Sequence, residues 1–159
     1  MSRYVHSASN VLKILGGNVP RCVLHAVLSS WTNSWTTERR FQQDMRDCVL
    51  CSSCKGKYEM EHYLVCPFGF QAISRKLRLS PSQNHAARFM LVDPRRSDDT
   101  VLMALALYGV RGTVHKLRAQ QYRAVPGESQ KQIWEQIRIA AAHHAGVGRR
   151  LKSLWSDVA

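Results

Sequence analysis

The residues most able to do chemistry in this 159-residue chain are four cysteines and one histidine that lie close together in the sequence. The segment DCVLCSSCKGKYEMEHYLVCP places Cys48, Cys51 and Cys54 at CxxC spacing and follows them with His62 and Cys66. A CxxC turn presents two thiolates on a tight knuckle, and two residues four positions apart share one side of a helical turn. Zinc takes four such ligands at tetrahedral corners, so the spacing predicts a structural Zn2+ site with no position left for an activated water.

The spacing leaves one of the four ligands open. Cys51, His62 and Cys66 belong to every reasonable set, and the fourth ligand is either Cys48 or Cys54. The apolar residues of CVLC are common between knuckle ligands, whereas the glycine after CSSC lets backbone amides face the thiolates. A CxxC redox pair is the weaker alternative, because it leaves His62 and Cys66 without a role. The odd total of five cysteines argues against a closed disulfide framework.

The charge of the chain indicates a polyanionic partner. Lys and Arg number 23 against 11 Asp and Glu, which gives a net charge of +12. A domain this basic repels itself, so nucleic acid is the first candidate partner and an anionic membrane surface the second. No apolar run approaches the roughly 20 residues that a bilayer span requires, so no membrane span is expected.

Basic residues that can contact phosphate are grouped around the cysteine segment and at both ends of the chain. They are Arg39, Arg40, Lys55, Lys57, Arg75, Lys76, Arg78, Arg95, Arg96, Arg149, Arg150 and Lys152. Trp31 and Trp134 lie on apolar helical faces and are expected in the core, whereas Trp35 and Trp155 remain candidates for stacking on bases.

The elements that must position these residues are helices, because no segment alternates with period two for any length. Apolar spacing and helix-terminating residues predict helices at 21–31, 72–79, 85–92, 100–123 and 130–144. Gly109 and Gly112 weaken the long helix and would allow another helix to approach it closely. The predicted class is therefore mostly α, a small helical domain with an irregular zinc-stapled CCHC module.

The chain divides into three parts on this interpretation. A basic arm at 1–20 precedes a helical domain at 21–124, which contains the zinc module at 48–67. A C-terminal helix and basic tail at 125–159 follow, and the tail after Gly148 is expected to be an extension that becomes ordered on RNA. The first acidic residue is Glu38, so the acid-free, Ser-containing N-terminus has the composition of a mitochondrial transit peptide. A short basic arm on a nuclear or cytoplasmic protein is the alternative.

One longer pattern is similar to a known family. The order SSWTNSWTTERRF, then CVLC or CSSC, then EMEHYLVCP resembles the C-terminal zinc-binding segment of reverse transcriptases from non-LTR retroelements. The similarity extends over about residues 24–118, and its sharpest motif is EHYLVCP at 61–67. It implies a CCHC zinc module that binds nucleic acid beside the polymerase. Cys51, His62 and Cys66 match the family pattern directly, but the third cysteine of CVLCSSC departs from it and leaves Cys48 and Cys54 as alternatives for the fourth ligand.

The polymerase itself has no counterpart in the chain. Its catalytic aspartates come as an aromatic-x-Asp-Asp turn, and here the only Asp pair, Asp98-Asp99, follows Arg96-Ser97 at a predicted helix start. We therefore expect no enzyme and no small-molecule substrate, but a zinc-containing RNA-binding component of a ribonucleoprotein, most naturally a mitochondrial ribosome. Its partners would be rRNA and neighbouring proteins of the particle. The alternatives are a nucleic-acid-gripping C-terminal fragment of a retroelement reverse transcriptase and a DNA-binding regulator.

Overall fold

The computed structural model describes residues 3–32, 34, 48–51, 54, 60–79, 97–120, 124–125, 127–144, 147–149 and 151–152. These residues contain no strand. Their helices are α1 Arg3–Gly16, α2 Arg21–Trp31, α4 Met60–Val65, α5 Phe70–Lys76, α7 Ser97–Ala119 and α8 Glu128–Ala142, and residues 147–149 and 151–152 are also helical. The predicted mostly helical class is confirmed. The helix predicted at 85–92 lies outside the described residues.

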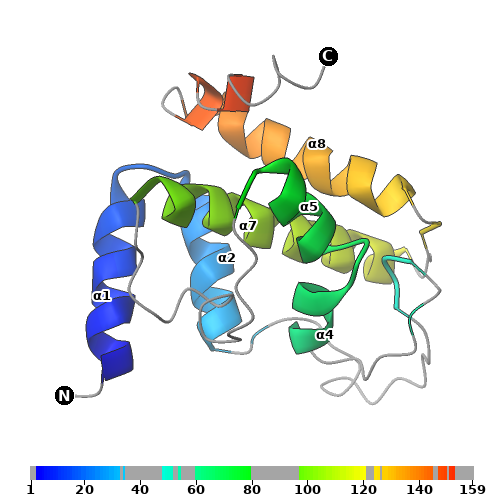
Figure 1. Ribbon diagram of the computed structural model, residues 1–159, viewed down its shortest axis with the longest axis horizontal. Coiled ribbons are helices and arrows are strands. Elements are labelled where there is room, and N and C mark those ends of the chain that lie inside the picture. Colours follow the sequence, from blue (N-terminus) through cyan, green and yellow to red (C-terminus); the bar gives the residue numbers. More distant parts are fainter. Residues whose placement is uncertain are drawn as a thin grey trace.

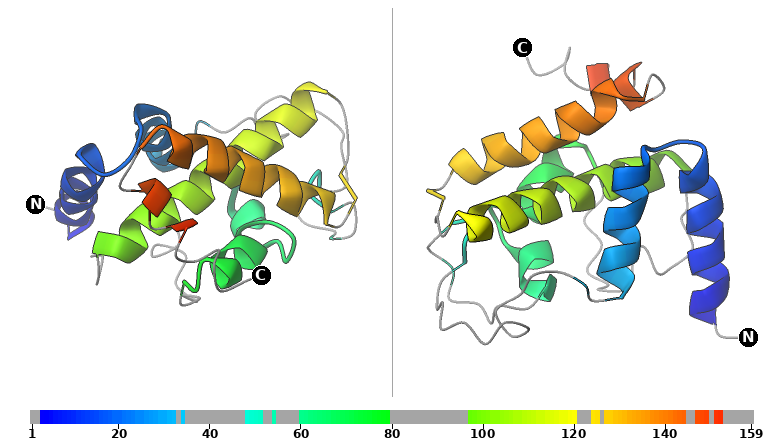
Figure 2. Two further views of the ribbon diagram at one scale, coloured as in Figure 1. Left: turned by 90° about the horizontal axis from the view of Figure 1, so that it is seen from above. Right: turned by 180° about the vertical axis from the view of Figure 1, so that it is seen from behind.

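Helix α7 is the centre of the molecule. It contacts α1, α2, α5 and α8. Helix α8 crosses one side of α7, while α1 and α2 pack on the opposite side, and α5 lies in the corner between α7 and α8 (Figures 1 and 2). The four consecutive residues Ala104, Leu105, Ala106 and Leu107 are all fully buried. One helical turn takes about 3.6 residues, so these side chains point in every direction and α7 is enclosed on all sides at this level.

The contact between α7 and α8 depends on a glycine. A Cβ atom placed on Gly109 would lie 2.8 Å from Cγ1 of Ile137 and 3.0 Å from the carbonyl oxygen of Ile133. One on Gly112 would lie 3.3 Å from the side-chain oxygen of Gln136. Both glycines therefore face α8, which confirms that they allow close approach of a second helix. Ile133 and Ile137 are fully buried in this contact.

Both ends of the chain contribute to the core. Val11 and Leu15 of α1 are fully buried, so the segment expected as an arm supplies core residues. Residues 147–149 and 151–152 are helical, with Val147 and Leu151 buried in the same cluster. The expectation that the tail after Gly148 is an extension is therefore wrong at its start, because Leu151 is apolar and packs inward while Arg149 and Lys152 stay exposed.

The tryptophans that the structure describes follow the prediction. Trp31 and Trp134 are partly buried and pack against the core. Trp35 and Trp155, the two candidates for base stacking, lie outside the described residues. Among the helices that the structure describes, none is both long enough and apolar enough to cross a bilayer.

Candidate metal centre

Two short segments bring the five predicted ligands together. The first is the turn at 48–51, in which the amide of Cys51 donates to the carbonyl of Cys48 over 3.3 Å, followed by Cys54. The second is α4, which carries His62 and ends just before Cys66. The amide of Cys66 donates to the carbonyl of His62 over 2.8 Å, so one more helical turn is completed and both side chains lie on one side. The helical turn expected at the i, i+4 pair is thus present.

The four sulfur atoms form a compact cluster. The Sγ atoms of Cys48, Cys51, Cys54 and Cys66 all lie within 4.8 Å of one another. The Sγ atom of Cys66 is 3.8 Å from that of Cys48 and 3.8 Å from that of Cys54. A tetrahedral zinc–thiolate centre with Zn–S bonds of about 2.3 Å has S–S edges of about 3.8 Å. The Cys51–Cys54 pair is closer, at 3.0 Å. The cluster can therefore hold a metal ion of this size.

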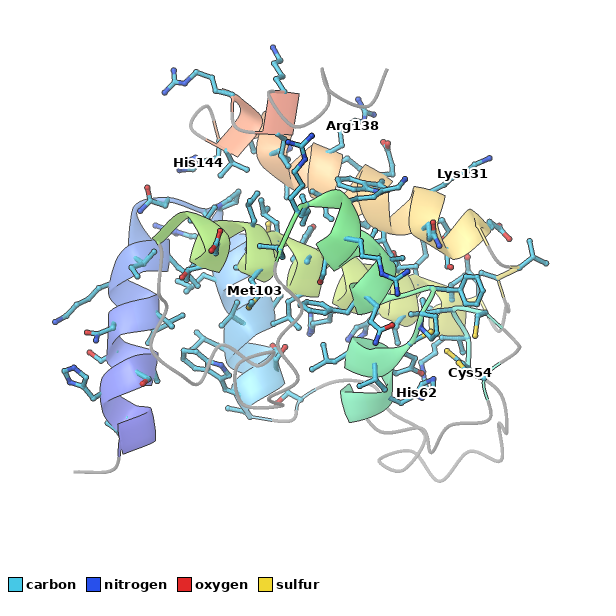
Figure 3. All side chains as sticks on the ribbon, in the orientation of Figure 1. Cys54, His62, Met103, Lys131, Arg138 and His144 are labelled. Atoms are coloured by element: carbon cyan, nitrogen blue, oxygen red, sulfur yellow. The ribbon has the colours of Figure 1, made fainter. Side chains whose placement is uncertain are left out.

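His62 lies at the edge of the cluster beside Cys54. Its Nε2 atom is 3.2 Å from the Sγ atom of Cys54 (Figure 3). The compact group itself consists of four cysteines and does not include His62. The structure thus provides five donors for four positions, and both Cys48 and Cys54 belong to the compact group. A CCHC set requires the imidazole to replace one of the thiolates, whereas an all-cysteine set leaves it beside the centre.

The centre is part of the hydrophobic core. Cys51 and Cys66 are fully buried, Cys48 is 1% exposed, and only Cys54 and His62 among the five are partly accessible. Val49, Leu50 and Leu64 surround them and are themselves fully buried. A metal bound here would lie largely within the core, as is usual for structural sites.

Without a cation the buried sulfurs do not all ionise. The Cys48 thiol donates to the Cys66 sulfur, which lowers the pKa of Cys66 to about 4, with a further lowering by His62. The same hydrogen bond, followed by burial, raises the pKa of Cys48. Burial, followed by the hydrogen bond to Cys51, raises the pKa of Cys54 to about 12. Several thiolates at this separation repel one another strongly in a buried site, so a bound cation is what would allow them to ionise together.

Three residues outside the predicted ligand set pack around the centre: Tyr63 of the EHYLVCP motif, and Arg118 and Gly69, which the sequence analysis did not single out. The Nη2 atom of Arg118 on α7 donates to the phenol oxygen of Tyr63 on α4 over 3.2 Å, and Tyr63 is fully buried. A Cβ atom on Gly69 would lie 2.9 Å from Cδ1 of Leu50 and 3.0 Å from the carbonyl oxygen of Tyr63. A glycine two residues after Cys66-Pro67, just before α5, was the signal available in the sequence.

The predicted phosphate-binding residues divide into those described and those outside the described part of the chain. Arg75, Lys76, Arg78, Arg149 and Lys152 are described, and all are exposed. The Nζ atom of Lys76 lies 5.5 Å from the centroid of the Trp134 ring, which joins the basic end of α5 to α8. The others, Arg39, Arg40, Lys55, Lys57, Arg95, Arg96 and Arg150, lie outside the described residues.

Comparisons with known proteins find no protein similar to this chain. No protein-family model, no curated protein and no solved structure matches the chain.

Proposed function

We propose that this chain is a zinc-containing, RNA-binding structural protein of a ribonucleoprotein particle, with a mitochondrial ribosome as its host. The observation that carries the proposal is the buried cluster of four cysteines with His62 at its edge. Sulfur-rich, four-coordinate, closed sites are the usual form of structural zinc in proteins. Zinc would there act as a cross-link between the turn at 48–51 and the end of α4.

The RNA part of the proposal is supported by charge. The net charge is +12, and Arg75, Lys76 and Arg78 expose three cations around the end of α5. Paired cations of this kind bind phosphate backbones irrespective of base sequence. The role is that of a scaffold that catalyses nothing, because the zinc site leaves no open coordination position for a reacting group.

The mitochondrial part of the proposal comes from the acid-free N-terminus. Because α1 buries Val11 and Leu15 in the core, the protein would keep this helix after import. Mass spectrometry of the protein recovered from the organelle tests that expectation by reading its N-terminal residue.

The first experiment measures metal in the purified full-length chain. We expect about one zinc per chain, and less than half an equivalent would contradict a structural zinc site. Cys66→Ser should lose the metal, because Cys66 belongs to every ligand set considered. Cys22→Ser is the matched control, since Cys22 is exposed and lies outside the cluster.

The second experiment measures binding to structured RNA over a range of salt concentrations. The affinity should fall steeply with salt, with a log–log slope of magnitude about 3 or more if at least four phosphates are engaged. A flat salt dependence would contradict phosphate binding. Co-sedimentation of the native protein with ribosomal particles would support the named host. Recovery with a polymerase would instead favour the retroelement fragment.

A further inference from the structure

A line of cationic side chains runs along α7, away from the basic residues noted in the sequence. Arg111, His115 and Arg118 follow one another at spacings of four and three, which places them on one face of the helix. Tyr108 precedes them by one turn on the same face. All four side chains are partly buried, so this face of α7 is only partly open to solvent.

Neighbouring helices mark both ends of this line. Burial, followed by the nearby thiol of Cys22 on α2, raises the pKa of Tyr108, which places that end of the line beside α2. Arg118 donates to Tyr63, which places the other end against α4. The line therefore extends along α7 from its contact with α2 to its contact with α4, two helices on the same side of α7 (Figure 1).

Arg111 is the residue in this line for which the described part of the chain supplies no counter-charge. Its Nε atom is buried and has no hydrogen-bond partner. Burial lowers its pKa, and among the described residues no carboxylate forms an ion pair with it. Arg111 and Arg118 both lower the pKa of His115, after the larger effect of burial, so the three groups are close enough to repel one another. A buried or half-buried cation is costly unless an anion accompanies it.

We propose that Arg111 and His115 on α7 form a binding site for a backbone phosphate of RNA. Arg118, which donates to Tyr63, positions this part of α7 beside α4. This inference rests on the proposed function and names a contact for it. The guanidinium supplies donors in a planar fork that suits a phosphate, and its partial burial restricts the side chain before RNA arrives. A phosphate oxygen would accept hydrogen bonds from the Arg111 guanidinium, whose Nε atom now has no partner.

The test is Arg111→Gln, with Arg138→Gln as the control for net charge. Arg138 lies on the outer side of α8, where it donates to Glu135 over 2.7 Å (Figure 3). We expect Arg111→Gln to weaken RNA binding several-fold and to reduce the magnitude of the log–log salt slope by about 1, while Arg138→Gln leaves the slope unchanged. The unfolding temperature of Arg111→Gln should equal or exceed that of the parent, because an uncompensated cation has been removed.

The outcomes separate this site from the general proposal. If the parent chain binds no RNA, the proposed function fails. If the parent binds with a steep salt slope that Arg111→Gln does not change, or that Arg138→Gln changes equally, only the α7 site fails. Should Arg111→Gln not fold, phenylglyoxal modification of the parent decides. RNA should then protect Arg111 and leave Arg138 reactive, and equal reactivity of Arg111 with and without RNA would overturn the site.

A second probe separates RNA from a small anion. Millimolar inorganic phosphate should give the parent at most a slight rise in unfolding temperature that Arg111→Gln lacks, whereas micromolar RNA should give a large one. If inorganic phosphate alone raises the unfolding temperature fully and RNA adds no further rise, the site binds a small phosphate ligand and the RNA contact is overturned.

Discussion

The pair of helices α7 and α8 and the cysteine-bearing region at 48–79 are stabilised in different ways. The helix pair consists of 23 and 15 residues joined by buried aliphatic side chains and a glycine contact. The cysteine region contains helices of only 6 and 7 residues around four sulfurs. Helices this short are marginal on their own. Apolar packing specifies the first region, whereas in the second we propose that a bound metal ion holds the chain segments together.

The two regions nevertheless share one core. Helix α5 contacts both α7 and α8, and the amide of Ala124, just beyond α7, donates to the carbonyl of Val49 over 3.1 Å. Tyr63 and Arg118 connect α4 to α7. Loss of the metal should therefore undock the cysteine region without dissolving the helix pair.

The largest expected effect is removal of the metal. A strong chelator, or Cys66→Ser, should abolish the folded state of the cysteine region, because structural zinc contributes roughly 10–16 kcal/mol of apparent binding energy, as much as the whole stability of a small domain. Hydrogen exchange resolved by residue measures this loss of structure. Protection of the amides should disappear at 60–79 and persist in α7 and α8. Full protection at 60–79 in the metal-free protein would show that the cysteine region folds without metal, as the helix pair does.

The helix pair is tested by Gly109→Ala and Gly112→Ala. A methyl group at Gly109 meets Ile137 and a backbone carbonyl, so we expect a loss of about 1–3 kcal/mol of unfolding free energy. A methyl group at Gly112 meets the end of the Gln136 side chain, which can rotate away, and alanine favours the helix by up to about 1 kcal/mol. Denaturant titration should therefore show a lower unfolding free energy for Gly109→Ala than for the parent, and a higher or clearly less reduced one for Gly112→Ala. Equal effects would mean that α8 does not approach α7 at Gly109.

A smaller effect is expected at the end of α5. Arg78 has a φ of 54°, and the amides of Arg78 and Leu79 donate to the carbonyls of Arg75 and Ser74, respectively. These bonds form a Schellman motif with an arginine where glycine is favoured. Arg78→Gly should raise the unfolding free energy by up to about 1 kcal/mol and weaken RNA binding at low salt. A lower stability of the variant would show that the Arg78 side chain contributes more than its backbone conformation costs.

The smallest effect is a pH dependence within α7. Burial, then the charges of Arg111 and Arg118, lower the pKa of His115 in the folded chain. The unfolded chain therefore binds the proton more tightly, and stability is complete above about pH 6.5 and declines as the pH falls below that value. The difference in stability between the parent and His115→Gln should change as the pH falls below about 6.5 and be constant above that value. A constant difference at all pH values would show that His115 does not titrate in this range.

Much of this protein was determined by local sequence. Helices α2, α7 and α8 follow from apolar spacing of 3 and 4 residues, because helical hydrogen bonds join residues that are close in the chain. The five candidate ligands were recognisable for the same reason, since knuckles and helical turns impose short spacings. The net charge follows from composition alone.

Other features were decided by tertiary structure. The sequence could not show that four cysteines would form the compact group with His62 at its edge, because the distance between the turn at 48–51 and α4 depends on how both pack around Leu50 and Tyr63. Nor could it show that α1 and Leu151 belong to the core, since a few apolar residues beside basic ones also suit a solvated arm. Arg111 on α7 has the spacing of an ordinary surface residue, and only the packing around that helix leaves it partly buried, with an Nε atom that has no hydrogen-bond partner.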